Sequence, residues 1–368
     1  MEIFIISSDS YNFENNNLNV GGVQTYLNNL IKVFIEMKIK VVLLQIGQQN
    51  KEKIINDFVK VYVVKSENKS VKKLIKFAEQ HANLNKDIIL FSTSTQIRKN
   101  KFKKSIAIQH GIYWDVKSIH GIKIKSDLFS IILRAIQSYT IVKQHKLVSK
   151  MVCVDYNYIN WLRTQITYRN LNCVPILNFA NFENNYIREI NKTKRINIVF
   201  ARRFAEIRGV DLICKVMPKI LEKYKNVFFA IAGNGGEKSK LVEVFKNIDR
   251  VIFTQYENSK SCEFHKDYDI ALIPSVGSEG TSLSLLEAMS VGCACVCSDV
   301  GGMSNIVLDG FNGIIIEPNE ELLFKAICDL IENEEKRTTI SKYAMESIKH
   351  SFSLEKWKKS WIDLINNI

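Results

Sequence analysis

The chain has 368 residues, is 46% hydrophobic and carries a formal net charge of +13. A single hydrophobic core rarely serves more than about 250–300 residues, so this length predicts two domains. No apolar run reaches the roughly 20 residues that span a bilayer, and the N-terminus lacks the basic start of a signal peptide. We therefore expect a cytoplasmic protein, not a secreted or membrane-spanning one.

The net positive charge of the chain comes from its first half. Residues 1–180 contain 26 Lys and Arg against 12 Asp and Glu, a net charge of +14, whereas residues 181–368 contain 25 against 26. A basic half can face anionic lipid headgroups or nucleic acid, or can simply be solvated. Because no nucleic-acid-binding module is recognisable, we expect no nucleic-acid partner. Contact with an anionic membrane surface and a merely solvated surface both stay open.

The eight cysteines form no disulfide pattern. Cys293, Cys295 and Cys297 alternate along the chain, which in a strand places all three on one face. Metal sites more often use Cys-x2-Cys pairs. We interpret these three as small buried hydrophobic residues and expect no metal site there.

A glycine pair opens the first predicted helix. Residues 2–8 read as a strand, a polar loop follows, and Gly21 and Gly22 then begin a helix with an apolar inner face. Strand, loop, Gly-Gly and helix is the arrangement in which a backbone can approach a phosphate closely. A Gly-Gly pair alone is a weak signal, and its place after the first strand is what strengthens it.

A histidine follows a later strand. Strands are predicted at 41–46, 61–64, 87–92 and 105–109, and the last of these ends at His110. Open α/β sheets bind ligands at the carboxyl ends of their parallel strands. Further along, the pattern predicts a helix that is apolar on one face and basic on the other, at residues 126–149.

A polar segment at 181–195 reads as an interdomain linker. It divides the chain into an N-terminal domain at 1–180 and a C-terminal domain at 181–351. A last amphipathic helix is predicted at 352–368.

Paired arginines follow the first strand of the second domain. That strand is predicted at 196–200, and Arg202, Arg203 and Arg208 come after it. Arg203 and Arg208, five positions apart, can clamp a diphosphate, because a guanidinium binds phosphate oxygens bidentately. A plain surface charge pair is the alternative. The next strands, at 227–232 and 251–254, are followed by Gly233-Asn234 and by Tyr256.

The most informative stretch runs from Pro274 to Val291. A buried strand leads into a loop of small residues and then into a helix that Thr281 or Ser282 can cap. The helix N-terminus offers free backbone N–H groups to an anion. Glu279 precedes this helix and Glu287 lies about two turns into it. Carboxylates suit hydroxyl groups, such as those of a ribose or a hexose, better than phosphates.

This Glu-x7-Glu stretch, Pro-Ser-x3-Glu-Gly-Thr-Ser-Leu-Ser-Leu-Leu-Glu-Ala-Met, resembles the donor site of retaining glycosyltransferases of family 4. The resemblance implies the α/β GT-B fold, with two doubly wound Rossmann-like domains facing a central cleft. The C-terminal domain would hold the nucleotide sugar and the N-terminal domain the acceptor, and the helix at 352–368 would pack back on the N-terminal domain.

The resemblance also implies roles for individual residues. His110 and Glu279 would contact the donor sugar, with Glu279 orienting hydroxyls rather than acting as a nucleophile, and Glu287 would bind the ribose. The residues expected to bind the diphosphate and the rest of the nucleotide are Gly21, Gly22, Arg203, Arg208, Gly233, Asn234, Tyr256, Gly280, Thr281, Ser282 and Leu283. In the motif Gly-Arg-Leu-x3-Lys-Gly, Arg203 takes the arginine position and Arg202 the glycine position. We expect a UDP-sugar donor and no metal or other cofactor.

The expected reaction is transfer of a hexose-type sugar, with retention, to a glycan or lipid-linked acceptor in cell-surface polysaccharide or lipopolysaccharide synthesis. The basic first half suggests a peripheral position at the inner membrane face. Transfer to a soluble or protein acceptor, a GT-B nucleotide-sugar epimerase and an inactive sugar-nucleotide-binding module are the alternatives.

Overall fold

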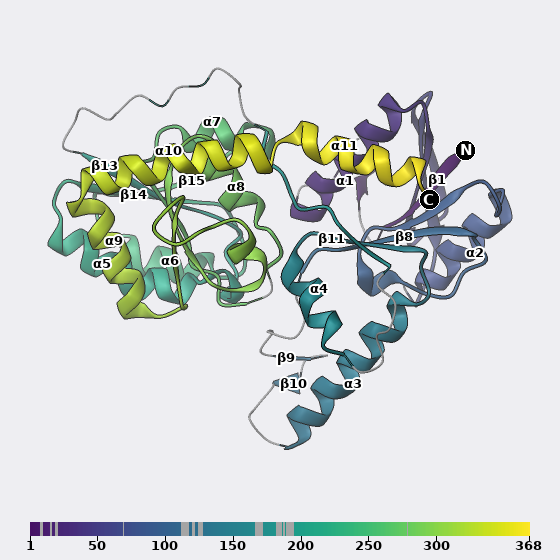
Figure 1. Cartoon of the computed structure of the whole chain (residues 1–368), viewed down its shortest axis with the longest axis horizontal. Coiled ribbons are helices and arrows are strands. Elements are labelled where there is room, and N and C mark those ends of the chain that lie inside the picture. The colour runs from purple at the N-terminus through teal and green to yellow at the C-terminus, as the bar shows by residue number, and fades with distance from the viewer. Residues whose placement is uncertain are drawn as a thin grey trace. The chain divides into compact units, whose positions relative to one another are not determined.

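The computed structural model describes residues 1–7, 10–14, 17–18, 21–68, 70–111, 118–119, 122–123, 128–165, 172–181, 186, 188, 195–277 and 279–368. The chain forms two compact units (Figure 1). Unit 1 comprises the described residues of Met1–His110, Ser118–Ile176 and Lys358–Ile368, and unit 2 comprises Gly111 and the described residues of Leu177–Trp357. Most of the predicted linker at 181–195 lies outside the described residues.

Unit 1 contains an eight-stranded sheet with the order β12-β11-β8-β7-β1-β4-β6-β5. All neighbours pair in parallel except β5 and β6. The central strands are buried on both faces, which is why the sequence shows them as continuous apolar runs. The strands are β1 (Glu2–Ile6), β4 (Lys40–Gly47), β5 (Lys51–Asn56), β6 (Val59–Lys65), β7 (Ile88–Phe91), β8 (Lys104–Gln109), β11 (Lys150–Cys153) and β12 (Cys173–Pro175).

Strand order in unit 1 reverses next to its first strand. The chain passes from β1 to β4 and β6 on one side, and then returns to β7, β8 and β11 on the other. Ligands of open α/β sheets bind at such a reversal, outside the carboxyl ends of the strands. Gly21 and Gly22 stand at the start of α1, the first helix after β1, and His110 directly follows β8. The two predicted features of unit 1 therefore belong to the same end of its sheet.

Within the described residues, four α-helices lie wholly in unit 1, and part of the last helix joins them. They are α1 (Gly22–Glu36), α2 (Val71–His81), α3 (Leu128–His145) and α4 (Tyr156–Arg163), with the second part of α11 (Leu354–Asn366). Helix α1 buries an apolar face that includes Tyr26, Leu30 and Phe34. Trp361 of α11 is fully buried and packs edge-on against Phe34.

Unit 2 contains a six-stranded parallel sheet with the order β15-β14-β13-β16-β17-β18. The chain moves outward from β13 to β15, then crosses to β16 on the other side of β13. The strand order thus reverses between β13 and β16, which makes the carboxyl ends of these two strands the expected ligand position. The strands are β13 (Ile196–Ala201), β14 (Val227–Ala232), β15 (Val251–Thr254), β16 (Ile270–Ile273), β17 (Ala294–Ser298) and β18 (Ile314–Ile316).

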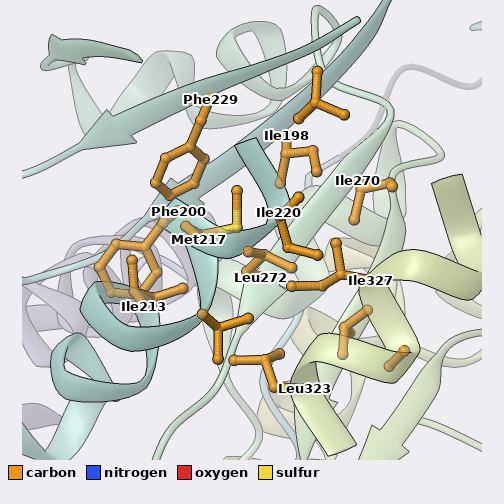
Figure 2. Close-up of a cluster of buried hydrophobic side chains, with 14 of the residues drawn as sticks. Ile198, Phe200, Ile213, Met217, Ile220, Phe229, Ile270, Leu272, Leu323 and Ile327 are labelled. Atoms are coloured by element: carbon orange, nitrogen blue, oxygen red, sulfur yellow. The ribbon is translucent and has the colours of Figure 1, made fainter. Parts of the chain in front are cut away.

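Helices cover both faces of the unit 2 sheet. On one face α5 (Val210–Lys223) and α9 (Glu320–Glu332) pack on side chains such as Phe200, Phe229 and Leu272 (Figure 2). On the other face α8 (Leu283–Ser290) and α10 (Glu334–Ser351) pack on the alternate residues of the strands. The remaining helices are α6 (Lys238–Phe245) and α7 (Ser261–His265).

The three alternating cysteines lie as the sequence predicts. Cys293, Cys295 and Cys297 are fully buried and free, and all three belong to the core on the α8 side of the sheet. Ala294 and Val296, between them, belong to the core on the other side. Within the described part of the chain, no helix is both long and apolar enough to span a membrane.

Candidate active site

A buried carboxylate lies at the strand-order reversal of unit 2. Glu279 follows β16, and its side chain is 8% exposed. Its Oε1 accepts a hydrogen bond from Ser275 Oγ at 2.7 Å and forms ion pairs with the guanidinium groups of Arg202 and Arg208. Arg202 also donates to Ser275 Oγ at 2.9 Å. One carboxylate oxygen is therefore held by three donors from two different strand ends.

The charges in this cluster determine the state of Glu279. Burial alone would raise the pKa of the carboxyl, because it disfavours the charged form. The guanidinium groups of Arg202 and Arg208, together with Ser275, outweigh burial and hold the pKa of Glu279 below its usual range. Glu279 is thus an ionised carboxylate at neutral pH, inside a cluster that carries a net positive charge.

Two glycines allow the loops around this cluster to approach each other. A Cβ on Gly301, which has a φ of +60°, would lie 1.9 Å from the backbone oxygen of Glu279. A Cβ on Gly233, which has a φ of +140°, would lie 2.0 Å from the backbone oxygen of Arg202. Only glycine fits such contacts. Gly233 therefore has a structural reason for its place after β14, independent of any nucleotide.

The neighbouring residues Arg202 and Arg203 have different environments in the structure. Arg203, which the motif aligns with the diphosphate-binding arginine, has an exposed side chain. Arg202, aligned with a glycine, is 5% exposed on its side chain and contacts Glu279. The next residue, Phe204, is buried and stacks on Phe200, so positions 202 and 204 point inward and position 203 points outward. Arg202 and Arg208 are the pair that meets Glu279, and a diphosphate role for Arg203 stays a prediction.

The second glutamate of the motif lies on α8 in a separate environment. Ser261 Oγ donates to Glu287 Oε2 at 2.6 Å. Burial raises the pKa of Glu287 to about 7, and the Ser261 hydrogen bond opposes that rise only in part. Tyr256 lies close enough to interact electrostatically with Glu287, and its ring stacks on Phe264 with 4.3 Å between centroids. Glu287 is therefore partly protonated near neutral pH in the absence of a ligand.

The turn before α8 has a structural anchor. Thr281 Oγ1 accepts from the backbone N–H of Asn178 at 2.9 Å, and Asn178 Nδ2 donates to the Thr281 carbonyl at 2.5 Å. Ser282 occupies the N-cap position without a capping hydrogen bond from its side chain. Gly280 is buried, and Leu283 begins the helix. Thr281 thus fixes this turn to the segment that enters unit 2.

The side chain of Asn234, which follows β14, has a local role in the structure. Its side chain is exposed, and Oδ1 accepts from the backbone N–H of Gly235 at 2.9 Å.

Across the described residues, no group of three or more His, Cys, Asp or Glu could hold a metal ion. Asp269, which directly precedes β16, accepts a hydrogen bond from the backbone N–H of Asn197 at 2.8 Å and forms an ion pair with Arg188 at 3.3 Å.

In unit 1, His110 has one ring nitrogen in a fixed role. Its Nε2 lies 3.0 Å from the carbonyl oxygen of Ser92, which follows β7. A carbonyl oxygen only accepts, so Nε2 carries the hydrogen and Nδ1 carries the lone pair. Burial lowers the pKa of His110 to about 4. His110 is therefore neutral at physiological pH and offers Nδ1 as an acceptor.

Helix α1 contacts His110 through Tyr26, and the last helix contacts Tyr26 in turn. Tyr26, one turn after Gly22 on α1, meets the His110 ring edge-on with 5.0 Å between centroids. Trp361 Nε1 donates to the Tyr26 hydroxyl at 2.9 Å. Gly21 occupies the N-cap position of α1. The sequence analysis missed Tyr26 and Trp361, because neither residue carries a local signal for this contact.

Unit 2 is similar to a known protein family. Residues 182–347 match the family model of glycosyl transferases group 1. The matched range contains Arg202, Arg208, Glu279 and Glu287. It therefore includes the whole charged cluster of unit 2.

Relatives of known sequence give the same result. The chain is 32% identical over 211 residues to an uncharacterised glycosyltransferase of Methanocaldococcus jannaschii, which is 55% of this chain and 52% of that protein. It is 26% identical over 207 residues to the poly(ribitol-phosphate) α-N-acetylglucosaminyltransferase of Staphylococcus aureus, 53% of this chain and 42% of that enzyme. The chain thus spans about half the length, or less, of these two relatives.

Solved structures establish the fold. A Staphylococcus aureus TarM mutant, solved with fondaparinux, α-GlcNAc-glycerol and UDP, matches all of both chains with a TM-score of 0.75 and 14% identity. The predicted GT-B fold, α/β with two parallel-sheet Rossmann-like domains, is confirmed by this likeness. The matches also support the prediction of a transferase.

Proposed function

We propose that this protein is a retaining glycosyltransferase of family 4. It moves a hexose-type sugar from a UDP-sugar to a glycan or lipid-linked acceptor in cell-surface polysaccharide or lipopolysaccharide synthesis. The observation that carries the proposal is the ionised, buried Glu279 held between Arg202 and Arg208 at the strand-order reversal of unit 2. A similarity to glycosyl transferases group 1 over this same unit supports it.

The arginines supply what sugar transfer needs from the protein. As the bond between the sugar and the diphosphate breaks, negative charge develops on the leaving phosphate, and preorganised cations stabilise it. Arg208 has a side chain that is 20% exposed, so it can reach a ligand while keeping its ion pair with Glu279. The first turn of α8 and the Gly21-Gly22 turn would add backbone N–H groups.

Glu279 is suited to orienting the sugar. Three donors occupy Oε1, and among the described residues no hydrogen bond goes to Oε2. Oε2 can therefore accept from a sugar hydroxyl while Oε1 keeps the carboxylate fixed. Two guanidinium partners also make the carboxylate a weak nucleophile, which favours an orienting role over a covalent one.

The remaining groups would bind the nucleotide and the far side of the sugar. Glu287 keeps Oε1 for the ribose hydroxyls, because Ser261 uses Oε2. Tyr256 would face the base, and Gly233 and Asn234 the nucleotide. In unit 1, the lone pair on Nδ1 of His110 would accept from a hydroxyl of the donor sugar. No metal enters this scheme, because the two arginines carry the positive charge.

Thermal unfolding with a panel of UDP-, GDP-, ADP- and CMP-sugars tests the proposal. A ligand present at about 100 times its Kd stabilises the native state by roughly 2.7 kcal/mol, which such a scan detects readily. We expect a UDP-sugar to stabilise the protein. Substitution of Glu279 should abolish this stabilisation. Stabilisation by no nucleotide sugar would contradict the proposal. Conversion of the donor to an epimer without any acceptor would replace the transferase with an epimerase.

A further inference from the structure

Helix α3 exposes an apolar face to solvent. In Figure 1 it extends away from the sheet of unit 1. Six large apolar side chains on it are between 48% and 73% exposed: Leu128, Phe129, Ile131, Ile132, Ile136 and Tyr139. Their spacing of one, three and four residues places them on one side of the helix. We call these six residues the α3 face.

The opposite side of α3, which is less exposed, mixes polar residues with the apolar Leu133, Ile141 and Val142. Ser130 is buried, and Arg134, Gln137 and Ser138 are partly buried. A helix on the surface of a globular protein normally has the reverse arrangement, with its apolar side toward the core. Contiguous exposed apolar surface of this kind marks an interaction site. The fold of unit 1 therefore leaves the α3 face for another partner.

Positive charge surrounds the C-terminal end of this helix. Residues 128–150 contain Arg134, Lys143, Lys146 and Lys150 and no Asp or Glu. Lys143 and Lys146 are exposed, and Lys143 continues the α3 face four residues beyond Tyr139.

A second lysine group lies at the same end of α3. Ser149 Oγ donates to the carbonyl oxygen of Lys103 at 3.2 Å, which brings the loop before β8 to the turn that follows α3. Lys99, Lys101 and Lys103 of that loop are all exposed. The α3 face thus ends in lysines from two separate segments of the chain.

We propose that α3 docks unit 1 onto an anionic lipid bilayer. The α3 face would enter the boundary between headgroups and acyl chains, and the lysines at its end would lie at the level of the lipid phosphates. A second copy of this chain fits less well, because residues 128–150 of its α3 segment contain no Asp or Glu to pair with the lysines, whereas lipid phosphates do pair with them. The proposal extends the proposed function, since docking on a bilayer would place the enzyme beside a lipid-linked acceptor.

Co-sedimentation with vesicles tests the proposal without any donor or acceptor. One vesicle preparation contains phosphatidylglycerol mixed with phosphatidylcholine, and the other contains phosphatidylcholine alone. The test variant carries Leu128→Ser, Ile132→Ser and Ile136→Ser. The matched control carries Ile54→Ser, Ile252→Ser and Leu308→Ser, which replace side chains of similar exposure elsewhere on the surface.

We expect the wild type and the control to bind the anionic vesicles at low salt, and to bind phosphatidylcholine vesicles weakly. The test variant should bind the anionic vesicles at least about tenfold more weakly, because three apolar side chains no longer enter the bilayer. The double variant Lys143→Glu and Lys146→Glu should lose binding at low salt.

Three results would overturn the proposal. The wild type could fail to bind anionic vesicles at any salt concentration, or the test variant could bind as well as the wild type. Alternatively, the wild type could be an oligomer that the test variant converts to a monomer, which would make the α3 face an interface between copies. A thermal scan of the test variant with the responding nucleotide sugar separates the two proposals. The test variant should keep the wild-type shift while losing vesicle binding. A normal shift in a wild type that binds no vesicles rejects only the α3 proposal, and vesicle binding by a wild type that shows no shift rejects only the transferase.

Discussion

Arg202 and Glu279 form a buried ion pair across the strand-order reversal of unit 2, although they lie 77 residues apart in the chain. Arg202 follows β13 and Glu279 follows β16, so the pair joins the two strand ends between which an open α/β sheet binds its ligand. Ser275 donates to Glu279 and accepts from Arg202, which fixes both side chains. The pair therefore positions the carboxylate before any ligand arrives.

Replacing Arg202 should destabilise the protein far more than replacing Arg203. Arg202→Ala leaves a buried carboxylate with Arg208 as its remaining cation, and removal of one partner of a buried pair costs about 3 kcal/mol. Arg203→Ala changes an exposed side chain and should alter the free energy of unfolding by less than about 0.5 kcal/mol. Urea denaturation of the two variants measures the difference. Equal stability losses would show that the buried pair is not formed.

Arg208→Ala should reduce catalysis more than it reduces stability. The side chain is only partly buried and, in the proposed function, faces the leaving diphosphate. By analogy with lost donors to a developing oxyanion, we expect kcat/KM for sugar transfer to fall by an amount equivalent to about 2–4 kcal/mol of transition-state stabilisation. Arg203→Ala in the same assay tests the motif alignment, which predicts a loss of similar size. Near wild-type kcat/KM for both variants would reject the diphosphate clamp.

Glu287 should make stability depend on pH in a definite direction. Its pKa in the native state is raised from 4.5 to about 7, so the native state holds a proton that the unfolded state has already lost in this range. Stability therefore falls as pH rises from about 4.5 to 7 and levels off above that. Glu287→Gln keeps a neutral side chain, so the variant should gain on the wild type across this window. Parallel stability curves from pH 4.5 to 8 would contradict the raised pKa.

His110 should have the opposite pH dependence. Its pKa is lowered to about 4, so the native state holds the neutral ring while the unfolded state takes up a proton below pH 6.5. Its contribution to stability is fully present above pH 6.5 and is lost as pH falls toward 4. NMR titration of the ring measures this pKa directly. A value near 6.5 would show that the ring is solvated and free of Ser92.

The hydrogen bond between Trp361 and Tyr26 should matter for the position of His110. Tyr26→Phe keeps the ring that meets His110 but leaves the buried Trp361 Nε1 without its acceptor, at a cost of about 1–2 kcal/mol in the free energy of unfolding. If this contact positions His110, KM for the donor should rise while the pKa of His110 stays low. Trp361→Phe, which removes the donor instead, should give the same change in KM. Loss of stability without any change in kinetics would make the contact purely structural.

Much of the fold follows from local patterns in the sequence. The strands of both sheets that are buried on two faces were predicted, because each reads as an apolar run with a turn at its end. Strand β5 was missed, since it is an antiparallel edge strand with mostly exposed residues and no apolar pattern. Helix α3 was predicted, but the exposure of its apolar side depends on packing within unit 1, which periodicity does not determine.

In the candidate site, too, local sequence patterns singled out some residues, whereas the contacts between them depend on the tertiary structure. The motif singled out Glu279, Glu287 and Arg208 as candidates, because their spacing along the chain is characteristic. It did not show that Arg202 rather than Arg203 contacts Glu279, since that depends on which side chains point inward after β13. The contact between Trp361 and Tyr26 joins residues 335 positions apart, and neither residue carries a local signal for it.

Product analysis by NMR tests the central claim most directly. The nucleotide sugar that stabilises the protein is incubated with glycan and lipid-linked acceptors, and both UDP release and the anomeric configuration of the product are followed. We predict UDP release that depends on the acceptor, a product with the donor's anomeric configuration, and loss of both in Glu279→Gln. An inverted product, a donor epimerised without acceptor, or full activity of Glu279→Gln would contradict the account.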